Sequence, residues 1–317
     1  MRCDGLTRRR WLGGSLGAAA CAVAGRVQAL PAVAARIDRV PLFDAAALGP
    51  QVVTVGERGV VFVSDDRGAH WRQVASGTES DLTAVHLSAR GAVAVGHRGH
   101  VVRSAAPGQP WLAAQVELPE DNSLFDVVMN GAQGWAVGAF GVIAQTLDGG
   151  ASWRGRRAMG DDFDKHLYGI ARTSKGELLV AGESGTLLFS GDGGASWQER
   201  PSPYVGSFFG VAVLERDRLL VHGMRGHAYH SDDAAASWRP VQGIPPGLSI
   251  QGARRLDDGR VTLAGLEGGV FVSRDNGATF TMQRPVDRRS ARVALAGAGQ
   301  ALLVFGEGGF YKLPASR

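Results

Sequence analysis

A four-residue unit, Gly-x-x-Gly, recurs seven times along the chain at an almost constant spacing. Successive copies are separated by 40, 42, 44, 41, 42 and 41 residues. The copies begin at Gly56, Gly96, Gly138, Gly182, Gly223, Gly265 and Gly306. A fixed period of this length indicates a fold built from one repeated supersecondary unit, such as a propeller.

Each copy lies between two short runs of β-favouring residues, for example residues 177–181 and 186–190. Two such runs joined by a glycine-flanked turn predict a β-hairpin, because glycine accepts the positive φ that hairpin turns need. The runs are almost continuously apolar rather than alternating. This pattern is expected where neighbouring sheets cover both faces of a strand.

Two further β-like runs complete each period, one after the hairpin and one before the next hairpin. Four short strands in about 42 residues are typical of a propeller blade. We therefore predict an all-β fold, a seven-bladed β-propeller with four-stranded antiparallel blades. The innermost strands are expected at residues 82–88, 124–130, 167–173, 208–214, 250–256 and 291–296.

The last copy ends after its third predicted strand, residues 310–313. A spare β-like segment, residues 34–42, lies near the other end of the chain. We predict that this N-terminal strand completes the last blade and so closes the ring, since pairing would cover an exposed sheet edge.

An acidic turn followed by an aromatic residue comes after most hairpins. Residues 146–153, 190–197 and 273–280 match the Asp-box pattern Ser/Thr-x-Asp-x-Gly-x-Ser/Thr-Trp/Phe, and residues 64–71 and 231–238 match it in part. We expect each carboxylate to accept hydrogen bonds from its own turn. Five equivalent aspartates cannot form one active site, so we interpret them as structural residues: Asp66, Asp148, Asp192, Asp233 and Asp275.

The first residues are typical of an export signal. Arg8, Arg9 and Arg10 precede an apolar run of small residues, and Val27-Gln28-Ala29 offers a peptidase cleavage site. The run is too short and too weakly apolar to span a bilayer. We predict that residues 1–29 form a removable twin-arginine-type signal, that the protein is periplasmic, and that residues 30–317 form the propeller.

The net positive charge of the chain comes from this predicted signal. The whole chain has 34 Lys and Arg against 30 Asp and Glu. The signal holds five arginines and one acid, so the mature part has 29 residues of each sign. A neutral mature chain gives no support for a nucleic-acid partner. Cys3 and Cys21 leave with the signal, so no thiol remains for catalysis or metal binding.

A catalytic set is hard to find. Asp boxes occur in sialidases, but those enzymes need an arginine triad and a tyrosine nucleophile, and the chain has four tyrosines and no Arg-Ile-Pro string. His222 and His227 flank one hairpin turn and are expected to face each other without further metal ligands. We therefore predict no enzymatic activity, no cofactor and no metal.

One polar pattern stands out among the hairpin turns. The third turn residue is arginine in three copies, Arg58, Arg98 and Arg225, and Arg288 and Arg289 lie in a nearby connecting loop. Because all the turns are expected on one face of the ring, these side chains form a candidate basic surface for a partner with carboxylates.

The export signal, the seven Gly-x-x-Gly hairpins and the Asp-Gly-Gly-x-Ser-Trp boxes together resemble the photosystem II assembly/stability factor family of BNR/Asp-box propellers, over essentially the whole mature chain. The resemblance implies a non-enzymatic assembly factor that binds a newly made membrane protein through an arginine-rich face, here Arg58, Arg98 and Arg225. It predicts a monomeric scaffold for a membrane or envelope complex, at most peripheral to the membrane. An accessory subunit of an envelope transporter and a carbohydrate-binding or carbohydrate-cleaving propeller remain as alternatives.

Overall fold

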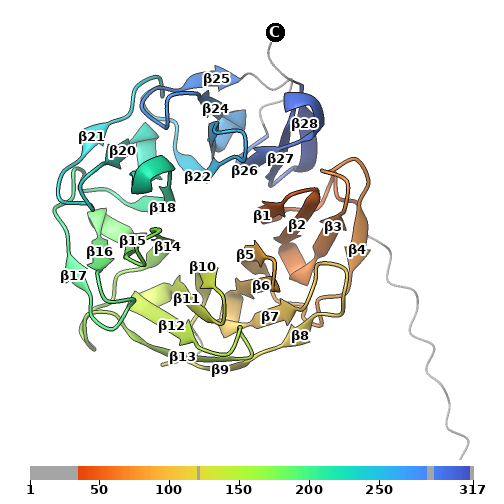
Figure 1. Cartoon of the computed structure of the whole chain (residues 1–317), viewed down its shortest axis with the longest axis horizontal. Coiled ribbons are helices and arrows are strands. Elements are labelled where there is room, and N and C mark those ends of the chain that lie inside the picture. Colours follow the sequence, from red (N-terminus) through yellow and green to blue (C-terminus); the bar gives the residue numbers. More distant parts are fainter. Residues whose placement is uncertain (1–34, 120–121, 284–288, 315–317) are drawn as a thin grey trace, which may run out of the picture. The chain divides into compact units, whose positions relative to one another are not determined.

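The computed structural model describes residues 35–119, 122–283 and 289–314. These residues form seven β-sheets arranged as blades around a central channel (Figure 1). The predicted all-β, seven-bladed propeller is therefore confirmed. The predicted signal, residues 1–29, lies outside the described residues. No helix within the described ranges is long and apolar enough to cross a membrane.

Six blades contain an antiparallel meander of four strands, ordered from the channel outward. Blade 1 contains β1 (Leu42–Leu48), β2 (Gln51–Gly56), β3 (Val61–Ser64) and β4 (Arg72–Val74); blade 2 contains β5 (Leu82–Ser88), β6 (Gly91–Gly96), β7 (Val101–Ser104) and β8 (Leu112–Ala113); blade 3 contains β10 (Leu124–Asn130), β11 (Gln133–Gly138), β12 (Val142–Thr146) and β13 (Ser152–Arg157). A short strand, β9 (Gln115–Glu117), adds to blade 3 in parallel with β13.

The remaining blades repeat this order. Blade 4 contains β14 (Leu167–Arg172), β15 (Leu178–Gly182), β16 (Leu187–Ser190) and β17 (Gln198–Glu199); blade 5 contains β18 (Phe208–Val213), β19 (Leu219–Gly223), β20 (Ala228–Ser231) and β21 (Arg239–Pro240); blade 6 contains β22 (Ile250–Arg255), β23 (Val261–Gly265), β24 (Val270–Ser273) and β25 (Thr281–Gln283); blade 7 contains β26 (Ala291–Ala296), β27 (Leu302–Gly306) and β28 (Gly309–Leu313). Three predicted innermost strands coincide with β5, β10 and β26, and the other three end one residue early.

The prediction that an N-terminal strand at residues 34–42 completes the last blade is wrong for the described residues. β28 pairs only with β27, and residues 36–40 form a turn rather than a strand. One backbone hydrogen bond links this turn to the last blade, from the N–H of Phe310 to the carbonyl of Ile37 at 2.8 Å. The chain enters a strand only at Leu42, after Pro41, and that strand is the innermost one of blade 1.

Side-chain packing closes the ring instead. Leu42 and Phe62 of blade 1 share one buried cluster with Leu303 and Phe305 of blade 7. Trp71, from the first Asp box, meets Phe305 edge-on at 5.8 Å between ring centres. Every blade interface thus depends on apolar side chains from two facing sheets, which explains why the strands are apolar on both sides.

The two glycines of each Gly-x-x-Gly turn have different roles. The last glycine has a positive φ, +68° at Gly99, as the sequence predicted. The first glycine is extended, with φ −165° at Gly96. A Cβ at Gly96 would lie 2.0 Å from the carbonyl oxygen of Asp81, so this position needs glycine because of close backbone approach.

The residue before five of the seven innermost strands binds two turns at once. The carbonyl of Asp81 accepts a hydrogen bond from the N–H of His97 in its own blade at 3.0 Å. Its carboxylate accepts one from the N–H of Arg58 in the preceding blade at 2.8 Å. We call this side-chain bond between neighbouring blades the latch. The same bond recurs at Ser123, His166, Ser207 and Ser249.

The close approach at the first glycine gives a stability prediction. Gly96→Ala should lower the free energy of unfolding by more than about 2 kcal/mol, because the new methyl group meets backbone that cannot move aside. Urea unfolding of the purified protein measures this change. The matched control is Gly149→Ala, where φ is +73° but no atom lies within 4 Å; conformational strain alone should cost about 1 kcal/mol there. Equal losses in the two variants would contradict the explanation.

Candidate functional site

The Gly-x-x-Gly turns and the starts of the innermost strands lie together on one face of the ring, here called the turn face. Six of the seven turns contain a short 3-10 helix: η1 (Glu57–Gly59), η2 (His97–Gly99), η3 (Ala139–Gly141), η4 (Glu183–Gly185), η6 (Met224–Gly226) and η7 (Leu266–Gly268); the seventh joins β27 directly to β28. The central channel opens on this face as a cavity of about 420 Å³. His97 of η2 and residues from all seven innermost strands contribute to its wall.

Four aromatic side chains line the cavity, and we call them the collar: Phe43, Phe125, Tyr168 and Phe209. Each is the second residue of its innermost strand, where the pairing register shifts by one residue. A bulge at this position redirects the side chain. Tyr168 stacks on Phe125 at 5.7 Å and meets Phe209 edge-on at 5.9 Å, so three of the rings form a continuous apolar surface.

Charged side chains lie deeper in the same cavity. Arg254 of β22 donates a hydrogen bond to the carboxylate of Asp44 on β1. Asp44 also accepts a hydrogen bond from the backbone N–H of Val85 in blade 2 at 2.9 Å. Burial raises the pKa of Asp44, and the charge of Arg254 opposes that rise. This ion pair connects blade 6 with blade 1 across blade 7.

Asp126 is the counterpart of Asp44 in blade 3, without the arginine. Its carboxylate accepts hydrogen bonds from the backbone N–H of Ile170 at 2.9 Å and of Val127 at 2.8 Å. Burial raises the pKa of Asp126 to about 7, and the negative charge of Asp44 adds to the effect. Burial lowers the pKa of His86 and of His222 to about 4, so both rings are neutral at neutral pH.

Three of the predicted arginines lie on the turn face. Arg58, Arg98 and Arg225 are exposed, and their side chains form no ion pair within the described residues. Their backbone has a positive φ of 53–57°, and the latch bonds hold it in place. The backbone positions from which these side chains project into solvent are therefore fixed.

The other two predicted arginines differ. Arg289 donates a hydrogen bond to the carbonyl of Gly308 at 2.7 Å, and its guanidinium lies over the ring of Tyr311. It is therefore held against blade 7. Arg288 lies outside the described residues.

Apolar side chains share the turn face with the arginines. Phe140, at the arginine position of its turn, is 44 % exposed and packs on His166 at 4.8 Å. Val205, in the connection after blade 4, is 90 % exposed. Acidic residues such as Glu57 and Glu267 occupy the same turns. The face is thus a mixed surface rather than a uniformly basic one.

The five predicted Asp-box aspartates lie in five different blades, at the opposite face of the ring. At Asp148, the hydroxyl of Ser152 donates at 2.6 Å, its backbone N–H at 2.9 Å and the hydroxyl of Thr146 at 2.8 Å. These hydrogen bonds, led by those from Ser152, lower the pKa of Asp148 to about 2. The same pattern is present at Asp192, Asp233 and Asp275, and at Asp66 the His70 ring takes the place of the second hydroxyl.

The histidines and tyrosines do not converge on one site. The ring of His222 lies in the channel wall with Nδ1 at 3.2 Å from the carbonyl oxygen of Ile250. His227 stacks on Tyr204 at 3.8 Å, so the expectation that the two imidazoles face each other is wrong. Within the ranges that the structure describes, no group of three or more His, Cys, Asp or Glu side chains is placed to hold a metal.

Several known proteins are similar to this chain. A family model described as photosynthesis system II assembly factor YCF48 matches residues 103–293. The photosystem II assembly lipoprotein Ycf48 of Synechococcus sp. (strain CC9902) is 27 % identical over 102 residues, which is 32 % of this chain and 30 % of that protein. The match thus spans less than a third of the curated relative.

Solved structures with the same fold include two YCF48 proteins. One, YCF48 bound to D1 peptide, has a TM-score of 0.70 at 15 % identity, covering 87 % of this chain and 92 % of that one. Another, YCF48 from Cyanidioschyzon merolae, has a TM-score of 0.68 at 17 % identity, with coverages of 86 % and 94 %. A streptogramin B lyase reaches 0.72 at 10 % identity, with coverages of 87 % and 93 %. At these identities the likeness concerns the fold alone.

The buried carboxyl of Asp126 gives a pH prediction. Its folded pKa of about 7 lies above the unfolded value, so the native state binds more protons between about pH 4 and pH 7. Stability contributed by the protonated group is then lost as the pH rises through this window. Relative to Asp126→Asn, the native chain should lose about 4 kcal/mol of unfolding free energy from pH 4 to pH 8. Urea unfolding at stepped pH measures the difference, and parallel pH profiles would contradict it.

Proposed function

The chain belongs to the family of photosystem II assembly factors of the Ycf48 type, and we propose from this that it is a non-catalytic protein that assists the assembly or stability of a membrane protein complex by binding one of its subunits. It acts after export to the periplasm by the twin-arginine route, as a monomer that is at most peripheral to the membrane. The observation that carries the proposal is the turn face, where the collar surrounds a cavity and three unpaired arginines lie around it.

The collar supplies the apolar part of the binding energy. Aromatic side chains bury large areas with few rotatable bonds, and they dominate the energetics of protein interfaces. A cavity of about 420 Å³ accommodates one or two side chains of a bound segment. Because the latches fix the turns before binding, little conformational entropy is lost when the partner docks.

The arginines supply orientation. Guanidinium groups form paired hydrogen bonds with carboxylates, so Arg58, Arg98 and Arg225 favour a segment with acidic residues or a free C-terminus. Arg292 lies over the ring of Phe43 at 5.9 Å and brings a further cation to the cavity. The partner segment is therefore expected to insert an apolar side chain among the aromatic rings while its carboxylates lie towards the arginines.

The relative solved as YCF48 bound to D1 peptide supports a peptide as the bound species. In the present chain, the same propeller offers a mixed apolar and cationic surface of suitable size. The five Asp boxes lie at the opposite face, and their carboxylates are hydrogen-bonded within their own turns, which supports the turn face as the surface for recognition.

Co-purification from detergent-solubilised membranes tests the proposal. The exported, tagged protein should retain a membrane-protein partner. Substituting Arg58, Arg98 and Arg225 with alanine, or Phe125 and Tyr168 with alanine, should reduce the recovered partner at least about tenfold, as expected when interface anchors worth about 1.4 kcal/mol or more are lost.

The control is Arg216→Ala, which removes an exposed arginine in η5 (Glu215–Asp217), at the end of the blade opposite the turn face. It should leave recovery unchanged, and all variants should unfold at similar temperatures. A partner retained by both groups of variants would place the binding surface elsewhere. Recovery of no membrane protein by the native chain would overturn the proposed function.

A further inference from the structure

Six of the seven interfaces between blades contain an aromatic residue that follows the hairpin of one blade: five of these residues end an Asp box, and Trp111 holds the same position in blade 2, where Ala106 replaces the aspartate. These residues are Trp71, Trp111, Trp153, Trp197, Trp238 and Phe280. Each joins the apolar cluster formed by its own blade and the preceding one. The cluster between blades 6 and 7 includes no box aromatic among the described ranges; it contains side chains such as Leu256, Val272 and Leu302, and Tyr311 of β28 packs against it.

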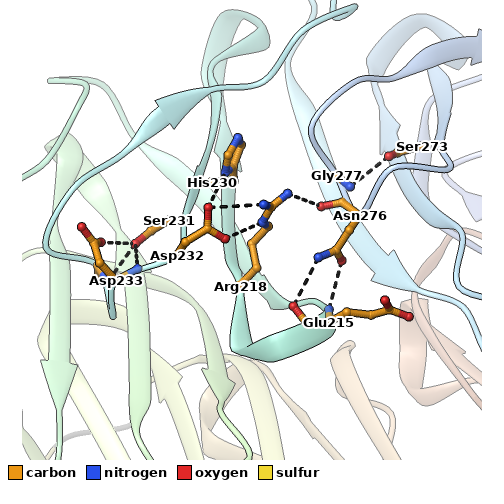
Figure 2. A network of polar contacts seen from close by, with 10 residues as sticks. Glu215, Arg218, His230, Ser231, Asp232, Asp233, Ser273, Asn276 and Gly277 are labelled. Carbon is orange, nitrogen blue, oxygen red and sulfur yellow. Dashed lines mark hydrogen bonds and ion pairs between the residues drawn. The ribbon is translucent and has the colours of Figure 1, made fainter.

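At the interface between blades 5 and 6, the Asp box of blade 6 packs against the end of blade 5 (Figure 2). The side chain of Asn276, in the box of blade 6, accepts from the N–H of Glu215 at 3.0 Å and donates to its carbonyl at 3.2 Å. Arg218 donates to the carbonyl of Asn276 at 3.0 Å while its other nitrogens bind Asp232. Phe280 follows and is buried in the same interface.

At the interface between blades 6 and 7, the position that corresponds to this box is a groove of about 340 Å³. The residues 42 positions after Arg218, His230 and Asp232 are Arg260, Val272 and Arg274, and all three line the groove. Blade 7 contributes Gln300, Leu302 and Pro314. Arg260 donates to the carbonyl of Gln300 at 3.1 Å, whereas its counterpart Arg218 donates to a box.

The outer edge of β28 borders this groove, and residues 37–39 cover only the beginning of that edge. The N–H of Phe310 faces away from β27, since it donates to Ile37. Lys312 is two residues further along β28, so its N–H and carbonyl face the same way, and they form no hydrogen bond within the described residues. Lys312 and Arg274 are also exposed cations without an ion pair in those residues.

We propose that the groove between blades 6 and 7 is a second docking site, which binds an extended segment of another protein that carries an aromatic residue and nearby acidic residues. The segment pairs antiparallel with β28, as the outermost strand does in the other blades, and supplies the missing main-chain partners. Its aromatic ring enters the groove over Val272 and Leu302, and its carboxylates meet Arg274 and Lys312.

Residues 35–41, which precede β1, do not occupy the groove. The N–H of Ala35 donates to the side chain of Gln73 on β4 at 2.9 Å, so the chain there lies towards blade 1. The cationic rim favours an acidic partner over a second copy of this chain, whose own edge would bring Arg274 and Lys312 against like charges. The site is independent of the turn face and of the proposed function.

A labelled peptide with the sequence of residues 190–199 tests the site, because it contains a complete box, Trp197, and the acids Asp192 and Glu199. Fluorescence anisotropy with the full chain should show saturable binding. Lys312→Pro removes the outward N–H, and Arg274→Glu reverses the charge of the rim; each should weaken binding at least about tenfold. A peptide with alanine at the Trp197 position should bind as weakly.

The matched control is Arg216→Glu, a charge reversal at an exposed residue outside the groove, which should bind the peptide like the native chain. Thermal unfolding verifies that each variant is folded. No saturation up to about 1 mM peptide, or equal affinity for all variants, would overturn the proposal. A dimer of the native chain that Lys312→Pro abolishes would also overturn it, since the occupant would then be a second copy.

Discussion

The close approach of each hairpin turn to the start of the innermost strands determines much of this propeller. The first glycine of the turn lies against a carbonyl oxygen of its own blade, and in five turns the third residue hydrogen-bonds to a side chain of the next blade. One residue, such as Asp81, serves both contacts. The packing between blades is apolar, and apolar contacts alone do not fix the orientation of one blade relative to the next. The hydrogen bonds at the turns are directional, so they fix how far each blade is rotated relative to its neighbour.

The collar and the unpaired arginines depend on this arrangement. The register shift at the second residue of each innermost strand occurs beside the latched turn, and it brings Phe43, Phe125, Tyr168 and Phe209 to the channel. Deeper in the cavity, Arg254 and Asp44 pair with each other, while Asp126 has only backbone partners. The channel is thus apolar at its rim and polar within, a combination suited to a segment with an apolar side chain and a hydrogen-bonding main chain.

The fold could be predicted from the sequence because a period of about 42 residues repeats one local pattern seven times. Residues 82–88, 124–130 and 291–296 were located to the residue because each lies between an aromatic and a hairpin glycine. The first innermost strand was missed, since no repeat precedes it, and residues 34–42 were assigned to the wrong blade. The aromatic collar could not be predicted, although Leu-Phe-Asp occurs at both 42–44 and 124–126. Its geometry depends on bulges, which periodicity does not reveal. Arg289 was grouped with the exposed arginines because its contact with Tyr311 is tertiary.

The ion pair between Arg254 and Asp44 also bears on the order of folding. The two residues are 210 positions apart, and the apolar contacts between blades 1 and 7 connect residues even more distant in sequence. None of these contacts can form before most of the chain has left the ribosome. The N-terminal blades therefore exist for some time without their contacts to blade 7, and the apolar side of blade 1 that faces blade 7 is exposed during that time. Contacts of such high sequence separation are slow to form. Ring completion is a late, post-translational event in the life of this protein.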